Sequence, residues 1–196
     1  MVVVEIDPLL IKHLSIRSDL DGLHIIHGDI LLQDIEDLPI EEPVRIVGNI
    51  PYNITSSIIF WLIEQLDFWD DAFIMMQKEV AQRLTANIGT KEYSRISVVV
   101  GAYLDMEMCF KIPPDVFIPK PKVESAIIRF TKKSSPIVAD NQYVKFNKIV
   151  KMAFSKRRKM LRNSLNDFDI PVSIQEEIDF TRRPETLSIE EFAKLL

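Results

Sequence analysis

The stretch Val44-Arg45-Ile46-Val47-Gly48-Asn49-Ile50-Pro51-Tyr52 joins a short β-branched run to a polar, proline-stiffened loop. Residues 54–57 then open an apolar segment, 58–66, which has the length and composition of a buried helix. The order strand, loop, helix places the loop at the carboxyl end of a strand. Open α/β sheets bind their ligands at such ends. The stretch therefore predicts an α/β fold with a ligand site at Asn49-Ile50-Pro51-Tyr52.

The chemistry of this loop suits the exocyclic amine of an adenine. The side-chain oxygen of Asn49 and the carbonyl of Ile50 can accept both amine hydrogens, which leaves the nitrogen lone pair free. Pro51 has no N–H and a fixed φ, so it holds the Ile50 carbonyl in one direction. Tyr52 offers a flat face on which a base can stack. An ordinary strand-to-helix turn remains an alternative, because Asn, Pro and Tyr are common in turns.

Strands and helices are predicted to alternate along the first part of the chain. Strands are expected at 2–6, 23–27, 44–47 and 72–76, with a first helix capped by Asp7 and Pro8 and a second at 58–66. The segment 96–104 fits either a strand or a buried helix, and we favour a helix. Late antiparallel strands are expected at 108–112 and 125–130, and further helices at 144–154, 160–165 and 189–196. This alternation predicts a parallel α/β sheet, with residues 135–141 as a linker between a unit at 1–134 and a helical unit at 142–196.

Two acids follow predicted strands in the same way as Asn49. Glu5 ends the buried run Val2-Val3-Val4, and Asp29 follows the run that ends at His27. In a doubly wound sheet such strand ends line one crevice, where carboxylates bind ribose hydroxyls and amino groups of a nucleoside. Each acid taken alone could equally mark a strand end or a turn.

Composition narrows the possible classes. The chain has 196 residues, 47% of them hydrophobic, which is enough for one sizeable core and a small second unit. A single cysteine, Cys109, precludes an internal disulfide, fits the cytoplasm, and is expected to be a small buried hydrophobe. The amino terminus lacks the basic residues of a signal peptide, and no apolar run approaches the roughly 18 residues of a membrane span. The three histidines have no metal-ligand spacing, so we expect no metal site. Because no apolar run is long enough to span a bilayer, we also expect no membrane partner.

Positive charge is concentrated in one window, although the net charge is −5. Between residues 141 and 166 lie eight of the 24 basic residues and none of the 29 acidic ones: Lys145, Lys148, Lys151, Lys156, Arg157, Arg158, Lys159 and Arg162. A solvated helix face is the usual explanation of such a run. The lack of any compensating acid in an acidic chain favours a nucleic-acid surface instead.

Three motifs together resemble the ribosomal RNA adenine dimethyltransferase family. They are the Gly48–Ile54 loop, the segment from Val116 to Ala126 with Phe117 before a proline-stiffened basic loop, and the basic run from Phe154 to Leu165. The resemblance extends from about Val2 to the C-terminus. It implies a Rossmann-like class I methyltransferase sheet that uses S-adenosylmethionine, followed by a small all-helical C-terminal domain. It also implies dimethylation of two adjacent adenosines of small-subunit rRNA, in the pre-30S particle and without an obligate protein partner.

The resemblance assigns roles to matching positions. Asn49 and Ile50 would hold the target amine, Pro51 would fix the loop, and Tyr52 and Phe117 would stack on the two faces of the base. The cofactor would be held at Glu5, Ile6, Asp29, Ile30 and Asn49, with Glu5 on the ribose and Asp29 on the adenine amine. RNA phosphates would be bound by Lys120, Lys122, Lys156, Arg157, Arg158, Lys159 and Arg162.

One feature of the family is not found in this sequence. The family has a glycine-rich loop upstream of its Glu5-type acid, whereas no two of the five glycines here stand in G-x-G spacing. We therefore expect an N-terminally incomplete member that lacks the first strand, with weak or no methyl transfer. A non-catalytic RNA-binding or ribosome-assembly protein is a rival interpretation, and a DNA adenine methyltransferase a weaker one. Retention of the Phe117 loop and the basic helices favours RNA.

Overall fold

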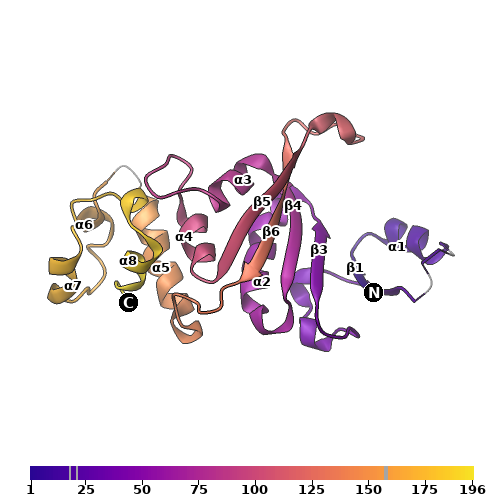
Figure 1. The fold of residues 1–196 in the computed structure, drawn as a ribbon, viewed down its shortest axis with the longest axis horizontal. Coiled ribbons are helices and arrows are strands. Elements are labelled where there is room, and N and C mark those ends of the chain that lie inside the picture. Colours follow the sequence, from indigo (N-terminus) through magenta and orange to yellow (C-terminus); the bar gives the residue numbers. More distant parts are fainter. Residues whose placement is uncertain (18, 21, 157–158) are drawn as a thin grey trace.

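The computed structural model describes residues 1–17, 19–20, 22–156 and 159–196. A four-stranded sheet lies in the middle of the molecule, with a two-stranded sheet at the N-terminal end and a group of helices at the C-terminal end (Figure 1). The loop between the last two strands projects beyond the sheet (Figure 1). The predicted class, a mixed α/β fold with a sheet and helices, is confirmed.

The N-terminal unit contains the strands β1 (Val2–Glu5) and β2 (His24–His27) and the helix α1 (Pro8–Ser15). The strands pair in parallel, with Glu5 opposite His27. Asp7 caps α1 as predicted, because its side chain accepts a hydrogen bond from the Leu9 amide at 2.8 Å. The expectation of a buried first strand is wrong: all of β1 is only half-buried, because β2 is the only strand that pairs with it among the described residues.

The main sheet has the order β3 (Arg45–Asn49), β4 (Asp71–Gln77), β6 (Ser125–Lys132) and β5 (Leu104–Ile112). β3 and β4 are parallel, whereas β6 runs antiparallel to both β4 and β5. The predicted antiparallel pairing of the late strands is therefore confirmed. The inner strands β4 and β6 carry most of the buried apolar residues of the sheet, as expected of strands paired on both sides.

Cys109 corrects a sequence-based expectation, because its side chain is exposed and not buried. The pairing of β5 with β6 shifts register between Met108 and Phe110, which leaves Cys109 without a partner residue in the ladder. Such a bulge in an edge strand turns the extra residue away from the core.

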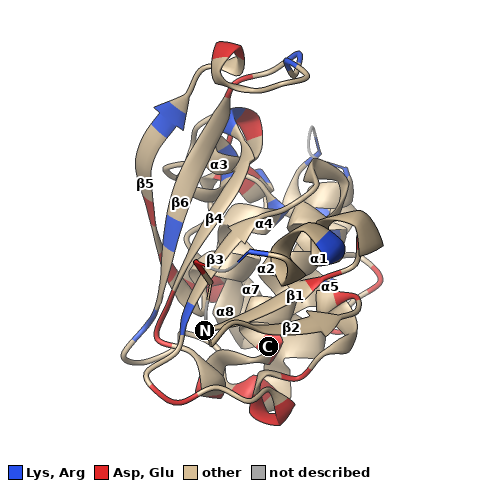
Figure 2. Ribbon diagram, turned by 90° about the vertical axis from the view of Figure 1, so that its right-hand side faces the viewer, with Lys and Arg blue, Asp and Glu red and all other residues tan. Residues whose placement is uncertain are grey.

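Three helices cover one side of the main sheet (Figure 2): α2 (Thr55–Glu64), α3 (Lys78–Leu84) and α4 (Arg95–Gly101). The segment 96–104 is thus a helix followed by the start of β5, as we favoured. Its first turn is fixed by a capping box in which the Ser97 hydroxyl accepts from the Ser94 amide at 2.9 Å. The three β-branched residues that suggested a strand, Val98, Val99 and Val100, are fully buried in the core.

The C-terminal helices share this core. They are α5 (Tyr143–Ser155), α6 (Leu161–Ser164), α7 (Val172–Glu177) and α8 (Ile189–Ala193). A Cβ on Gly101 would lie 2.7 Å from Ile189 Cδ1, so the glycine lets the Ile189 side chain of α8 pack directly against α4. Arg95 of α4 donates to the Asn147 side chain of α5 at 2.8 Å and lies over the Phe60 ring of α2. The helices and the main sheet therefore form one continuous hydrophobic core.

Short 3₁₀ helices form several connections: η1 (Ile30–Leu32), η2 (Ile35–Asp37), η3 (Tyr52–Ile54), η4 (Leu66–Phe68), η5 (Pro114–Val116), η6 (Asp140–Gln142) and η7 (Pro184–Thr186). In the predicted linker, the Ile137 amide donates to the Ala102 carbonyl at 2.8 Å and Val138 is buried. Its role as a domain boundary stays a prediction. No helix in the described part of the chain is long and apolar enough to cross a bilayer.

Candidate active site

The loop that follows β3 begins with an exposed amide side chain. Asn49 is the last residue of β3 and lies opposite Met75 of β4. Among the described residues, no hydrogen bond partner is found for its side chain, so both its oxygen and its amide group are available to a ligand. Pro51 then leads into η3, which contains Tyr52, and α2 begins at Thr55. The strand thus carries the predicted amine clamp to the surface, and the helix fixes its other end.

Gly48 allows the strand to pack tightly immediately before the clamp. A Cβ at this position would lie 2.9 Å from Ile74 Cδ1 and 3.3 Å from Ile50 Cγ2. Carbon atoms pack at about 3.5–4.0 Å, so both contacts would be too short. The backbone at the clamp is therefore seated directly against the buried side chain of Ile74 on β4.

A hydrogen bond joins the clamp to the root of the projecting loop. The Tyr52 hydroxyl lies 2.6 Å from the Ser125 hydroxyl, and Ser125 is the first residue of β6. The strand register agrees with this contact, because Gln77 at the end of β4 is opposite Ser125. Residues 49–54 and the loop 113–124 consequently lie at the same end of the strands of the main sheet.

The projecting loop carries the second predicted stacking residue. Phe117 is half-buried and follows η5, where its amide donates to the Pro114 carbonyl at 3.2 Å. Lys120 is exposed and forms an ion pair with Asp115, and Lys122 is exposed as well. At the root of the loop, the ammonium group of Lys78 pairs with Glu124 and holds the pKa of that carboxyl below its usual value.

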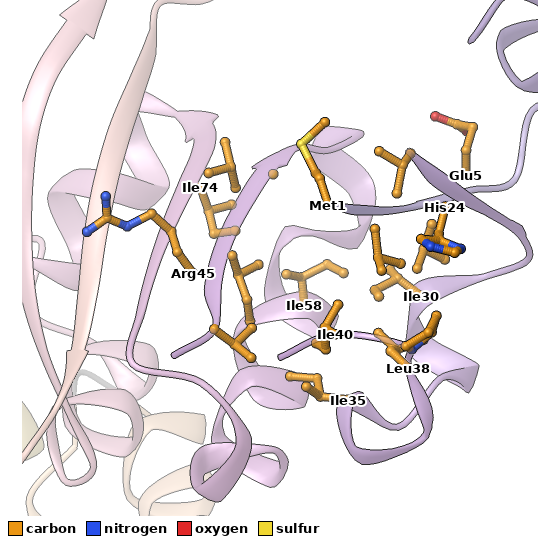
Figure 3. A pocket seen from close by; sticks show the side chains of 18 of the residues that line it. Met1, Glu5, His24, Ile30, Ile35, Leu38, Ile40, Arg45, Ile58 and Ile74 are labelled. Atoms are coloured by element: carbon orange, nitrogen blue, oxygen red, sulfur yellow. The ribbon is translucent and has the colours of Figure 1, made fainter. Parts of the chain in front are cut away.

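A cavity of about 770 Å³ lies between β1 and β3, the facing edge strands of the two sheets. Figure 3 shows isoleucines along its floor, Glu5 at one rim, and Arg45 directed away from it. Of the predicted cofactor residues, Glu5, Ile30 and Asn49 line this cavity, and Ile50 of the clamp lines it too. Asp29 and Ile6 do not, and Ile6 is 62% exposed.

The two predicted cofactor acids each keep one carboxylate oxygen free. Glu5 Oε1 accepts from the amides of Ile6 and Asp7 at 2.8 and 2.9 Å, and Asp29 Oδ1 accepts from the Leu31 amide at 3.0 Å. Hydrogen bonds to the other oxygen of either acid are absent among the described residues. The free Glu5 oxygen lies at the rim of the apolar cavity and fits a ribose hydroxyl, and the free Asp29 oxygen, on a residue that does not line the cavity, fits the amino group of a nucleoside. The residues present therefore fit the nucleoside part of S-adenosylmethionine.

The basic run lies on the C-terminal helices. Lys156 follows α5, Lys159 lies between α5 and α6, and Arg162 lies within α6, and all three are exposed. None of the three takes part in an ion pair with a described residue. Arg157 and Arg158 lie outside the described residues. Figure 2 shows several acidic stretches at the lower edge of the view, below β1 and β2.

The family model described as ribosomal RNA adenine dimethylase matches residues 1–195. The chain belongs to this family. The ribosomal RNA small subunit methyltransferase A of Saccharophagus degradans is 42% identical over 202 residues, which cover all of this chain and 74% of that protein. A dimethyladenosine transferase from Plasmodium falciparum has a TM-score of 0.82 at 25% identity and covers all of this chain and 80% of its own. The 23S rRNA methyltransferase ErmE has a TM-score of 0.69 at 26% identity, over 99% of this chain and 79% of its own.

Members of the ribosomal RNA adenine dimethylase family are rRNA adenine dimethyltransferases that use S-adenosylmethionine as the methyl donor. The assignment of this chain to the family from its three motifs is confirmed. The roles of the individual residues stay predictions. Sequence reasoning missed Ser125 as a partner of Tyr52, because 73 positions separate the two and no local pattern links them.

Proposed function

We propose that this protein transfers methyl groups from S-adenosylmethionine to the exocyclic amines of two adjacent adenosines of small-subunit rRNA. Its substrate would be the pre-30S particle in the cytoplasm. The observation that carries the proposal is the arrangement at the edge of the sheet. The Asn49 amide, which has no hydrogen bond partner among the described residues, follows β3, and Tyr52 of the same loop is hydrogen bonded to the root of the loop that holds Phe117. Family membership supports the same chemistry.

The clamp would act on the amine and on the base separately. The Asn49 oxygen and the Ile50 carbonyl would accept the two amine hydrogens, which raises electron density on the nitrogen and directs its lone pair away from the loop. Tyr52 and Phe117 would stack on the two faces of an adenine turned out of the RNA, a contact worth about 1–3 kcal/mol per ring.

The bound cofactor supplies an electrophilic methyl group on a sulfonium. The amine held by Asn49 and Ile50 would accept this methyl group as the sulfonium releases it, and the amine proton would pass to water, so no strong protein base would be needed. Positioning supplies most of the rate enhancement in such a displacement. Glu5 and Asp29 would hold the nucleoside part of the cofactor through their free oxygens. Within the described residues, no strand pairs with the edges of β1 and β3 across the cavity, so we expect weak cofactor affinity and transfer that requires a high cofactor concentration.

The test is transfer of a labelled methyl group to unmethylated small-subunit particles at a saturating cofactor concentration. Asn49→Ala removes the amine acceptor, and Asn53→Ala removes a second exposed amide from the same loop as a matched control. We expect a loss of about a hundred-fold for Asn49→Ala, the size of a misplaced reacting group, and little change for Asn53→Ala. Equal losses in both variants, or no transfer by the unaltered chain, would contradict the proposal. RNA binding without transfer would instead favour the non-catalytic RNA-binding alternative.

A further inference from the structure

Ser125 is a fully buried polar residue at the edge of the sheet where the clamp lies. Its relative exposure is 0%, and its backbone is held between Gln77 of β4 and Ile112 of β5. A serine with strands on both sides has little freedom to move. The position of Ser125 is therefore held by the pairing of β6 with both neighbouring strands.

The hydrogen-bond partner of Ser125 is Tyr52, the residue proposed to stack on the target base. The Tyr52 hydroxyl lies 2.6 Å from Ser125 Oγ, at the distance of a good O–H···O hydrogen bond. Tyr52 itself lies in η3, a single 3₁₀ turn with no side-chain cap. Such a turn does little to hold an aromatic ring in place, so its orientation depends on contacts outside the turn.

The hydrogen bond between Tyr52 and Ser125 also connects the loop after β3 to the loop that carries Phe117. Ser125 directly follows Glu124, whose carbonyl accepts from the Lys78 amide at 2.9 Å and whose carboxylate pairs with the Lys78 ammonium group. These contacts fix the end of the loop that carries Phe117. One hydroxyl pair thus joins the Tyr52 turn to the base of the opposite loop.

We propose that Ser125 is a positioning residue that sets the orientation of Tyr52 for stacking on the target adenine. The proposal rests on the proposed function, since it assumes that Tyr52 receives the base. It explains why a tyrosine, with a hydroxyl, is useful where stacking alone needs only a ring. Ser125 acts through Tyr52 and does not touch the substrate.

Two variants remove the bond from opposite sides, Ser125→Ala and Tyr52→Phe, and the double variant removes both hydroxyls. Thr131→Val is the matched control, because it deletes a hydroxyl from the same strand at a position with no side-chain hydrogen bond among the described residues. An RNA hairpin with 8-vinyladenosine at the target position, a fluorescent adenosine that keeps its exocyclic amine, reports stacking as fluorescence quenching. Amide hydrogen exchange of residues 52–54, measured without RNA, reports how well the turn is held.

We expect each single variant to weaken stacking by about five- to ten-fold, the effect of one neutral hydrogen bond. The double variant should be no worse than either single variant, exchange at residues 52–54 should speed up in all three, and Thr131→Val should match the unaltered chain. Binding of a generic RNA should be unchanged, since the basic run is untouched. Ser125→Thr, which keeps a hydroxyl, should restore at least part of the loss.

The inference is overturned if only one of the two single variants has an effect, if their effects add in the double variant, or if Ser125→Ala behaves like Thr131→Val. A different result separates it from the proposed function. If the unaltered chain does not quench the probe, the proposed function fails, and the exchange measurement still decides whether Ser125 holds the Tyr52 turn.

Discussion

Substitution of Gly48 by alanine should disturb the clamp from within the sheet. The new Cβ would lie 2.9 Å from Ile74 Cδ1, about 0.6 Å less than the shortest comfortable carbon contact, and 3.3 Å from Ile50 Cγ2. Ile74 is 1% exposed and packs between the strand and the cavity that it helps to line. Overpacking of this kind costs about 1–3 kcal/mol of unfolding free energy. Because Ile50 is predicted to provide a carbonyl acceptor for the target amine, a shift there should also reduce methyl transfer by up to about a hundred-fold.

The clash can be relieved by a second substitution. Ile74→Val deletes the Cδ1 atom that the new Cβ meets, at a cost of about 0.5–1.5 kcal/mol on its own. The double variant should therefore lose less stability than the two single variants added together, by on the order of 1 kcal/mol. Transfer should recover only in part, because the contact with Ile50 Cγ2 remains.

Urea unfolding of the four proteins gives the stability cycle, and the transfer assay with labelled cofactor gives the activity. Ile74→Val also serves as the control for simple loss of core volume. Additive stability costs, or a Gly48→Ala variant as stable and active as the unaltered chain, would show that the strand has room at this position and would refute the packing argument.

Three further predictions concern other parts of the molecule. Tyr52→Ala should lower methyl transfer far more than cofactor binding measured by calorimetry, and equal losses in both would contradict its assignment to the base. Glutamine at Lys156, Lys159 and Arg162 should lower the slope of log affinity for RNA against log salt by about 2, roughly 0.7 for each lost phosphate contact, whereas Lys12→Gln should not. Acidification should destabilise the C-terminal helices in part through Glu191. The Arg182 guanidinium holds the pKa of Glu191 below its ordinary value of 4.5, so its stabilising contribution is present above that pH and is lost as the pH falls through the lowered pKa. The urea midpoint of Glu191→Gln should therefore start lower than that of the unaltered chain near neutral pH, and the two should converge in acid.

Local sequence patterns were sufficient to predict most of the secondary structure. Short apolar runs, several of them β-branched, predicted each strand of the sheets to within a few residues, and the Asp7-Pro8 pair predicted the start of α1. The helices α3 and α7 were not predicted. α7 has six residues and no buried side chain, so it has no apolar stripe, and such a short helix depends on its surroundings and not on its own propensity.

Features that depend on how the strands pair could not be predicted from the sequence. The exposure of Cys109 follows from a bulge between Met108 and Phe110, and composition alone favours a buried cysteine. One contact in the candidate site could not be predicted for the same reason. The residue types at 49–52 indicated an amine clamp, but the hydrogen bond from Tyr52 to Ser125 exists only because β4 and β6 pair so that Gln77 meets Ser125.

The continuous core would determine where bound RNA lies relative to the predicted clamp at residues 49–52. α4 packs on the sheet side of the core, and Arg95, Gly101 and their partners join it directly to α5 and α8. The basic residues after α5 and in α6 are therefore held at a set distance from the loop after β3. Phosphate contacts carry no base information by themselves. Held on the same hydrophobic core as the predicted adenine clamp, however, they would restrict methylation to adenosines at a matching distance along the folded RNA. We therefore expect selection of the target to come from this spacing together with the clamp, because the basic run alone would bind any phosphate backbone.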